Sequence, residues 1–300
     1  MTRIAVVGEA LVDVVVGGES HAGGSPMNVA VGLTRLGYPS ELNAWIGSDG
    51  HGDLIRAHLA ADGVQLGAGT RSEGPSWTAS VDLDADGRAE YAFRLHGDIP
   101  IPAIDEYELV HTGSIGALRE PASSALLEAF RAAPARTVRS FDPNIRAAVI
   151  GPAAADRVFA LAASAQIVKL SDEDAAWLRP GQHPADVLRE LADGGTRFAV
   201  VTRGPEGALA LVDGVVYERP ALPVTVADTI GAGDAFMSGL LFGLLRDGAD
   251  RLIAGGAPIP AQLVTSALDT ALTSAAIAVS RVGANPPHSD ELAAGSVRQS

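Results

Sequence analysis

Asp228-Thr229-Ile230-Gly231-Ala232-Gly233-Asp234-Ala235-Phe236 is a turn of small residues that leads into a long apolar helix. Glycine lets the backbone come close to a ligand, and the first turn of a helix has amide groups without intrahelical acceptors. Those amides and the helix dipole attract anions, so the segment predicts a phosphate cradle. Asp234 falls beside this cradle, where a carboxylate could accept a proton from an attacking hydroxyl group. The same letters would also arise if Asp234 only complemented the helix N-terminus.

A second glycine-rich segment, Gly23-Gly24-Ser25-Pro26-Met27-Asn28-Val29-Ala30, also leads into a helix, which continues through residues 33–37. The two segments resemble the signature regions of PfkB (ribokinase-like) carbohydrate kinases, whose patterns are G-G-x-x-x-N-x-A…L-x-x-L-G and D-T-x-G-A-G-D-x-F. Four further stretches match family motifs in the family's order: residues 8–13, 140–146, 201–207 and 276–284. One such motif is weak evidence, but their joint order along nearly the whole chain is specific.

This resemblance implies a ribokinase-like α/β fold, with a mostly parallel Rossmann-like sheet, helices on both faces and a small β lid over the sugar. It also implies transfer of a phosphoryl group from ATP, together with Mg²⁺, to a hydroxyl group of a small sugar. Asp234 would be the catalytic base, and Gly231, Ala232 and Gly233 would form the anion hole.

The resemblance assigns further roles to individual residues. The candidate sugar-binding residues are Asp13, Gly24, Asn28, Phe93, Arg94 and Arg146. Three of them have simpler explanations, because Asp13 could cap a turn, Asn28 could be a helix N-cap and Arg146 could be an ordinary surface arginine. The candidate ATP-binding residues are Ser171, Thr202, Gly204 and Gly207. Asp228, Ile230 and Gly283 lie where some relatives bind K⁺, largely through backbone carbonyl groups.

One segment departs from the family pattern. The family usually has N-x-x-E before the nucleotide loop, where the polar side chains order Mg²⁺ through water. This chain has Ser171 at the asparagine position, followed by Asp172, Glu173 and Asp174. Spacing favours Asp174 as the acidic residue, whereas Glu173 has the usual side chain. A helix N-cap at Ser171 with acidic residues in the first turn would explain the same letters.

Short apolar runs alternate along the chain with alanine-rich amphipathic segments. The predicted buried strands are residues 4–7, 42–46, 109–111, 138–141, 167–170 and 198–201. The predicted helices are residues 29–36, 54–61, 124–132, 154–163, 185–192, 235–245 and 266–279. Independently of the motifs, this alternation predicts a mostly parallel sheet covered by helices on both faces. We expect residues 1–300 to form a single kinase domain.

Two period-two runs, residues 77–83 and 88–95, flank the turn Asp84-Ala85-Asp86-Gly87 and predict a β-hairpin. With the strand-like run at 11–16, they predict a small antiparallel flap, so that lid strands would come from about 11–22 and 77–95. Phe93 and Arg94 are neighbours on one strand and should face opposite ways. The flap could also be a peripheral hairpin without a function. A lid of this kind could bury its apolar face against a second copy, which makes a homodimer plausible.

The composition excludes several classes of function. A net charge of −14 disfavours nucleic acid and anionic membranes as partners. The absence of cysteine excludes disulfides and thiolate metal sites. Residues 1–8 indicate a first strand and not a signal peptide, and no uninterrupted apolar run approaches about 18 residues. We therefore expect a cytoplasmic protein that does not span a membrane.

The expected substrate is D-fructose. No cluster of basic side chains lies near residues 23–28, which favours a neutral sugar over a sugar phosphate. Asp13 and Asn28 suit a polyol, and the Asp142–Arg146 motif resembles the fructokinase and 2-keto-3-deoxygluconate kinase branches. The second branch remains an alternative because Arg94 and Arg146 could bind a carboxylate; a ribokinase or nucleoside kinase comes third. A sugar or nucleotide sensor without catalysis is the non-enzyme alternative, against which the presence of Asp234 counts.

Overall fold

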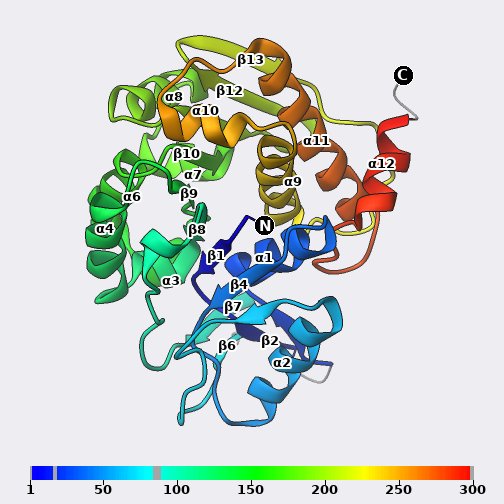
Figure 1. Ribbon diagram of the computed structural model, residues 1–300. Coiled ribbons are helices and arrows are strands. Elements are labelled where there is room, and N and C mark those ends of the chain that lie inside the picture. The colour runs from blue at the N-terminus through cyan, green and yellow to red at the C-terminus, as the bar shows by residue number, and fades with distance from the viewer. Residues whose placement is uncertain (1, 16–18, 84–88, 298–300) are drawn as a thin grey trace.

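The computed structural model describes residues 2–15, 19–83 and 89–297 (Figure 1). Their main sheet is made of β1 (Ile4–Val7), β4 (Ser40–Asn43), β5 (Gln65–Leu66), β8 (Leu109–Gly113), β9 (Val138–Asp142), β10 (Ile167–Ser171), β11 (Phe198–Thr202), β12 (Ala208–Val212) and β13 (Val215–Arg219). The strand order is β13-β12-β11-β10-β9-β8-β1-β4-β5, and neighbours from β11 to β5 are parallel. The predicted buried strands are therefore confirmed to within a few residues at their ends.

Two cores cover the two faces of this sheet. The first contains α1 (Ser25–Arg35), α2 (Gly50–Asp62), α9 (Ala232–Arg246), α10 (Ala249–Gly255) and α11 (Ala261–Val279). The second contains α3 (Ser114–Leu118), α4 (Ala122–Ala132), α6 (Ala155–Ala163), α7 (Asp172–Leu178) and α8 (Pro184–Asp193). Within β1, Ile4 and Val6 belong to the first core and Ala5 and Val7 to the second. The strands are buried on both faces because helices cover both, as the near-continuous apolar runs predict.

An antiparallel hairpin of β12 and β13, which was not predicted from the sequence, extends the sheet at one edge. Its turn is Asp213-Gly214, with φ of 49° and 79°. Asp-Gly between two apolar runs is a strong hairpin signal, because both turn residues must adopt positive φ. The short helices α5 (Ala147–Ile150) and α12 (Ser289–Val297) were not predicted either.

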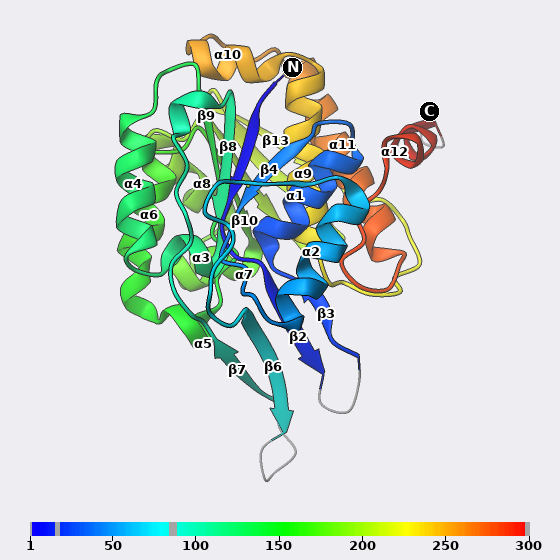
Figure 2. The ribbon, with the colours of Figure 1, turned by 60° about the horizontal axis from the view of Figure 1, so that its bottom comes forward.

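A second, four-stranded sheet projects from the carboxyl edge of the main sheet (Figure 2). It contains β2 (Leu11–Val15), β3 (His21–Gly23), β6 (Trp77–Leu83) and β7 (Ala89–Arg94), in the order β3-β2-β6-β7. The expectation of a wholly antiparallel flap is wrong, because β2 and β6 pair in parallel. They run parallel because each leaves the main body in the same direction. The predicted turn at 84–87 lies outside the described residues, between the end of β6 and the start of β7.

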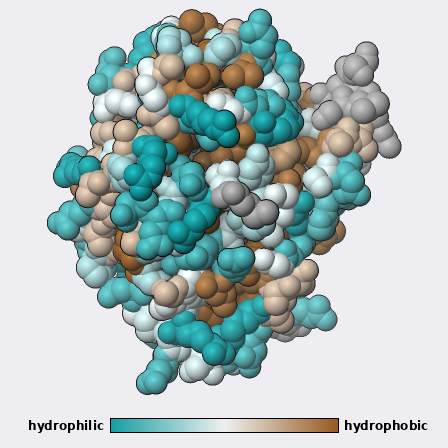
Figure 3. Space-filling view, viewed as in Figure 1, coloured by the Kyte–Doolittle hydropathy of each residue, from teal (hydrophilic) through white to brown (hydrophobic). Residues whose placement is uncertain are grey.

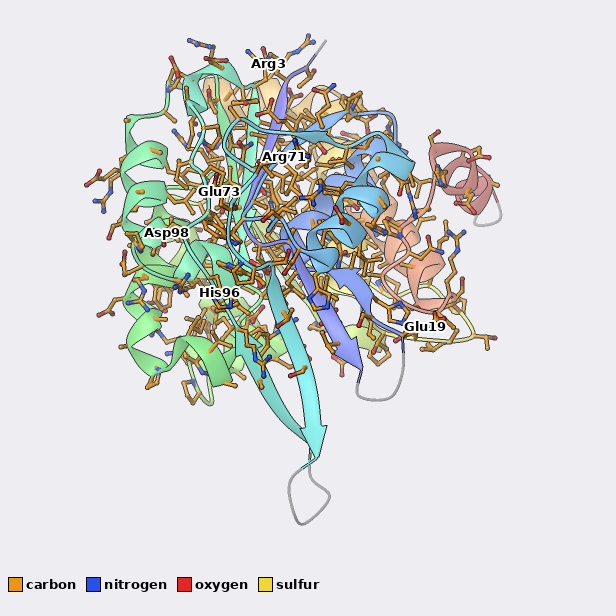
Figure 4. The ribbon with its side chains drawn as sticks, turned by 90° about the horizontal axis from the view of Figure 1, so that it is seen from below. Arg3, Glu19, Arg71, Glu73, His96 and Asp98 are labelled. Carbon is orange, nitrogen blue, oxygen red and sulfur yellow. The ribbon has the colours of Figure 1, made fainter. Side chains whose placement is uncertain are left out.

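The lid sheet is anchored where it meets the main body. The indole of Trp77 is buried and donates its N–H to the carbonyl of His96, just after β7. The Arg119 guanidinium lies 5.6 Å from the centre of the same ring. Figure 4 places His96 beside the base of β7 and Glu19 on the opposite side of the sheet, near β2 and β3. The base of the lid is therefore packed, whereas its tip extends away from the main sheet.

The long helix α11 is, among the described residues, the one helix that is long and apolar enough by composition to cross a membrane. Polar residues interrupt it, so a search for uninterrupted apolar runs does not detect it. Half of its most apolar window is buried inside the protein, where it packs along α9 in the first core. On the face shown in Figure 3, hydrophilic and apolar residues are interspersed.

A histidine is buried in the middle of the main sheet. His111, on β8, is fully buried, and its Nδ1 lies 3.1 Å from the Ser140 hydroxyl on β9. Burial, and to a smaller degree the neighbouring Lys169 ammonium, lowers the pKa of His111 to about 3. The unfolded chain binds a proton at this residue near pH 6.5, whereas the folded chain does not.

The protein should therefore lose stability as pH falls below 6.5, because only the unfolded state gains this proton. Between pH 7 and pH 5 the loss from His111 is about 2 kcal/mol. Urea unfolding of His111→Gln at several pH values should show a pH dependence weaker by this amount. His288→Gln, at an exposed histidine, is the matched control. Equal pH dependence in wild type and His111→Gln would contradict this assignment.

Candidate active site

The parallel strands bring the predicted site residues to one edge of the main sheet. The paired ends of its central strands lie side by side, as the registers Val7↔Thr112, Gly113↔Asp142 and Ser171↔Thr202 demonstrate. Ligands bind outside the carboxyl ends of the strands in open parallel sheets. The lid sheet projects from this same edge (Figure 2). The motifs that are far apart in sequence therefore meet between the main sheet and the lid.

Asp234 is buried in the first turn of α9 and is held by two side chains of α1. The Ser25 hydroxyl donates to Oδ1 at 2.6 Å, and Asn28 Nδ2 donates to Oδ2 at 2.8 Å. The alternative explanation of Asn28 as an N-cap is wrong, because the N-cap of α1 is Gly24. Each carboxylate oxygen keeps a lone pair, so Asp234 can still accept a hydrogen bond from a substrate hydroxyl.

The turn before Asp234 has the shape of an anion site. Gly231 is the N-cap of α9 with φ of 74°, and a Cβ there would lie 2.7 Å from the Cβ of Ala284. Both its conformation and its space therefore require glycine. The amides of Gly233 and Asp234 have no acceptor among the described residues, since the first hydrogen bond of the helix runs from Ala235 to Gly231. These free amides at the start of a 15-residue helix form the predicted cradle.

Asp13 lies on the lid sheet and is joined to Asp234 through a short segment. Its Oδ2 is 2.5 Å from where a Cβ of Gly23 would be, which presses the carboxylate against β3. One residue separates β3 from α1, namely Gly24, with φ of 115°. Ser25 follows and donates to Asp234. Asp13 belongs to β2, and partial burial raises the pKa of its carboxyl group.

The neighbours Phe93 and Arg94 lie on opposite faces of the lid. The registers place Asp13, Ala79 and Phe93 in one row across three strands. Paired residues in adjacent strands share a face, so Phe93 lies on the face of Asp13, while Arg94 lies on the other. Phe93 is half-buried against the second core and Arg94 is exposed. The structure thus brings Phe93 to the predicted sugar site and does not bring Arg94 there.

Arg146 lies near two carboxylates at the sugar end of the site. Its positive charge acts on both Asp13 and Glu9, favouring their ionised forms. Its own hydrogen bonds go to the carbonyls of Asn144 and Ile145 in its loop. Glu9, which was not predicted, is buried and accepts a hydrogen bond from the Gly116 amide at 2.8 Å. Burial raises the pKa of the Glu9 carboxyl.

The candidate nucleotide residues line the next two strands. Thr202 ends β11 beside Ser171 of β10, and its hydroxyl is 3.4 Å from the Leu170 carbonyl. Gly204 and Gly207 have φ of 50° and 92° and enclose one turn of 3₁₀ helix. This compact turn closes with a hydrogen bond from the Arg203 amide to the Gly207 carbonyl, 2.7 Å long. The turn lies at the carboxyl edge, as an ATP loop requires.

Ser171 and Asp174 form a capping box at the start of α7. Ser171 Oγ accepts from the Asp174 amide at 3.0 Å, and Asp174 Oδ2 accepts from the Ser171 amide at 2.9 Å. Asp174 Oδ1 accepts from the Ile145 amide at 2.7 Å, which fixes the loop that bears Arg146. Asp174 is therefore buried and fully engaged, whereas Glu173 is exposed. The N-cap explanation of Ser171 is confirmed.

No group of three or more acidic or histidine side chains within the described residues could hold a metal ion alone. Mg²⁺ generally binds through substrate phosphates, water and one or two carboxylates, so this fits an ion that arrives with ATP. The candidate K⁺ residues do meet: Asp228 accepts from the amides of Ile230, at 3.0 Å, and Gly283, at 2.8 Å. These backbone hydrogen bonds lower the pKa of Asp228.

Ser25, Glu9 and a buried ion pair were missed from the sequence. Lys169 Nζ lies 2.9 Å from Asp142 Oδ2, and both residues are buried. Burial raises the pKa of Asp142 to about 6, although the nearby Lys169 opposes this. A signal was available for Lys169, because it is the only lysine in the chain. No comparable signal marks Ser25 or Glu9.

Comparison with known proteins identifies the family of this chain. The chain matches the pfkB family of carbohydrate kinases over residues 1–291. It is 35% identical to a fructokinase of Klebsiella pneumoniae over an alignment of 322 residues, which covers 97% of this chain and 98% of the relative. The structure of a Xylella fastidiosa fructokinase with bound ATP has a TM-score of 0.85 and 25% identity, covering 99% and 98%. A Vibrio cholerae fructokinase with bound fructose, ADP and calcium ion has a TM-score of 0.79 and 27% identity, covering 99% and 98%. The chain therefore belongs to the pfkB family and is an ATP-dependent carbohydrate kinase, a phosphotransferase with an alcohol group as acceptor.

Proposed function

We propose that this protein phosphorylates D-fructose with ATP and Mg²⁺ in the cytoplasm. The observation that supports this most directly is the position of Asp234, at the entrance of the anion cradle and held by Ser25 and Asn28. A protein that only sensed sugar or nucleotide would need no base there. The similarity to the Klebsiella fructokinase over nearly both full chains supports the choice of sugar.

In the proposed reaction the sugar hydroxyl lies between Asp234 and the γ-phosphate of ATP. Its proton passes to Asp234, its oxygen bonds to the γ-phosphorus, and the bond from that phosphorus to the β–γ bridging oxygen breaks to release ADP. The free amides at the start of α9 stabilise the charge on the phosphoryl oxygens. Mg²⁺ would come with ATP and neutralise phosphate charge, with Ser171 and Glu173 at the nearest strand end. Positioning supplies most of the rate in such a reaction.

ATP would lie along the carboxyl edge near β10, β11 and the start of α9. Thr202, Gly204 and Gly207 are proposed to contact it on one side. Large exposed apolar side chains gather near the anion hole, among them Val226, Ile230 and Val282, which are 58%, 60% and 83% exposed. Asp228 joins the last two segments through its hydrogen bonds. An apolar rim of this kind suits the flat adenine base, and K⁺ at Asp228, Ile230 and Gly283 would order the same loops.

The electrostatics of the sugar end favour a neutral substrate. Arg146 lies at this end, and its charge acts on Glu9 and Asp13. An arginine balanced by protein carboxylates has less need of a substrate carboxylate. Arg94 faces away from Asp13, which removes the second candidate partner for an acidic sugar. Asp13, Gly24 and Phe93 are proposed to bind the sugar. 2-Keto-3-deoxygluconate is the second candidate.

The proposed function also includes closure of the lid and assembly into a homodimer. Residues 1–300 would act as a single domain in which the lid strands, from about 11–22 and 77–95, close over the sugar. Closure would exclude water and limit wasteful hydrolysis of ATP. The projecting lid sheet would be the contact surface of a homodimer, which size-exclusion chromatography of the intact chain can test.

The substrate assignment predicts a preference in steady-state kinetics. Under identical Mg²⁺ and K⁺, kcat/KM for fructose should exceed that for 2-keto-3-deoxygluconate, ribose and adenosine. The expected margin is at least tenfold, or about 1.4 kcal/mol in transition-state binding. Chelation of Mg²⁺ should abolish turnover. A tenfold preference for any competitor would overturn the assignment of fructose.

The role of Asp234 predicts a defect in catalysis and not in nucleotide binding. Asp234→Asn should lower kcat by roughly two orders of magnitude or more, because the amide cannot accept the proton. ATP binding, measured by calorimetry, should stay close to that of wild type. Asp290→Asn, at an exposed aspartate, is the control. Near-normal turnover by a folded Asp234→Asn variant would exclude Asp234 as the base.

The orientation of the lid predicts different effects at adjacent residues. Phe93→Ala should raise KM for the sugar severalfold, because Phe93 shares the face of Asp13. Arg94→Ala should change KM by less than twofold, because it lies on the opposite face. Both substitutions are on the same strand, so a general effect on lid stability would change KM to a similar extent in the two variants. A larger rise in KM for Arg94→Ala than for Phe93→Ala would place the sugar on the face of Arg94.

A further inference from the structure

The single lysine of this chain is buried against the anion hole. Lysine and arginine total 22 residues, of which Lys169 is the only lysine. All the other residues in this total are arginine. Lys169 is only 3% exposed, so it contributes nothing to the charge of the surface. A requirement specific to lysine must therefore exist at this position.

The ammonium of Lys169 lies beside the third residue of the predicted cradle. Lys169 is in the middle of β10, and its Nζ donates to Asp142 Oδ2 at the end of β9, 2.9 Å away. A Cβ built on Gly233 would lie 2.9 Å from the same Nζ. Nothing but the hydrogens of a glycine thus separates the ammonium from the start of α9. The charge lies next to Gly233, whose amide and that of Asp234 have no acceptor among the described residues.

The surroundings of the Lys169 ammonium keep it charged, and they leave some of its N–H groups without an acceptor in the described structure. Burial alone lowers the pKa of Lys169, but the carboxylates of Asp142, Asp174 and Asp234 outweigh burial and raise it above its ordinary value. An ammonium has three N–H donors. Within the described part of the chain, Nζ donates to Asp142 alone. Two donors therefore remain available on a charge that cannot reach solvent.

The space explains why arginine does not occur here. The lysine ammonium is a compact point charge, whereas a guanidinium is a broad planar fork. With Gly233 in contact on one side and Asp142 on another, the larger group would push against the start of α9. A buried ion pair is also weak evidence for a role in stability, because desolvation cancels much of its attraction. The arrangement is better explained by a phosphate group that would bind at the start of α9.

We propose that Lys169 is the cation of the anion hole, which donates from its free N–H groups to the phosphoryl group transferred from ATP. This inference rests on the proposed kinase function. As the sugar oxygen bonds to the γ-phosphorus and ADP departs with the electrons of the broken bond, the sugar proton passes to Asp234. Lys169 keeps all its protons and stabilises the charge of the phosphoryl oxygens. Asp142 is a positioning residue that aims the ammonium.

Because the lysine is unique, its side chain can be observed directly. Protein made with lysine labelled at ¹⁵Nζ and ¹³Cε should give a single side-chain resonance. Saturating AMP-PNP with Mg²⁺ should shift this resonance and slow exchange of its Nζ protons with water, and ADP should do so much less. Calorimetry on the same samples establishes saturation. An unchanged resonance in the AMP-PNP complex would overturn the proposal.

A pair of variants separates catalysis from structure. Lys169→Met leaves Asp142 unpaired and is expected to destabilise the fold, so the informative variant is K169M combined with D142N. Removing both charges restores much of the stability, because no buried charge is left alone. This double variant should melt near the wild-type temperature, yet kcat should fall about 100- to 1000-fold. Its affinity for AMP-PNP should no longer exceed that for ADP by the wild-type margin. A double variant with kcat within threefold of wild type would refute the proposal.

Different results would exclude the proposed substrate and the proposed role of Lys169. Arg189→Met, at an exposed arginine of α8, is the control for removal of a basic side chain and should leave activity unchanged. If wild type phosphorylates none of the sugars tested but AMP-PNP still shifts the lysine resonance, the proposed substrate is wrong and the role of Lys169 stands. If wild type phosphorylates fructose while the resonance does not respond to AMP-PNP, the role of Lys169 alone is wrong.

Discussion

The active site depends on the hydrogen bonds between Asp234 and two side chains of α1. Ser25 lies 209 positions away from Asp234 in sequence, so these bonds join the first and last thirds of the chain. A buried carboxylate is costly unless it is hydrogen-bonded. The two helices must therefore present their N-termini to each other, and this sets where the cradle, the base and the lid segment lie. The sheet below supplies the rigid support for this arrangement.

A second buried pair, Lys169 with Asp142, lies on the sheet side of the same cradle. Burial, together with this neighbouring ammonium, lowers the pKa of His111 and keeps its imidazole neutral. The positive charge of the region is therefore concentrated on Lys169. The chain is strongly acidic overall, with a net charge of −14. A polyphosphate therefore meets favourable charge only within the site, from buried groups whose field is little screened by salt. Burial thus allows an acidic protein to hold an anionic substrate.

Periodicity predicted most of the main sheet, because strands buried on both faces are runs of apolar residues bounded by turns. The first turn of α9 was predicted for a different reason, because a run of small residues with glycines before an apolar helix is typical of a helix N-terminus that can approach an anion. Ser25 could not be predicted, since its partner lies in another helix. Arg94 and Phe93 could be separated only once the lid registers were known. The β12–β13 hairpin and Lys169, in contrast, had signals in the sequence, namely Asp213-Gly214 and a lysine count of one.

The connection between lid and base gives the fold a mechanical property. β3 pairs with β2, which bears Asp13, and only Gly24 separates β3 from Ser25. This connection requires glycine, because the φ of Gly24 is 115° and a Cβ there would lie 2.8 Å from the Glu9 carbonyl oxygen. Ser25 follows Gly24 directly and donates the 2.6 Å hydrogen bond to Asp234, so a short continuous path joins β3 to this carboxylate. In the proposed reaction, a sugar at Asp13 would contact the strand that pairs with β3, next to the segment that holds the proposed base. The geometry thus connects the proposed sugar site to the proposed catalytic carboxylate through one short segment, without requiring any contact between Asp13 and Asp234.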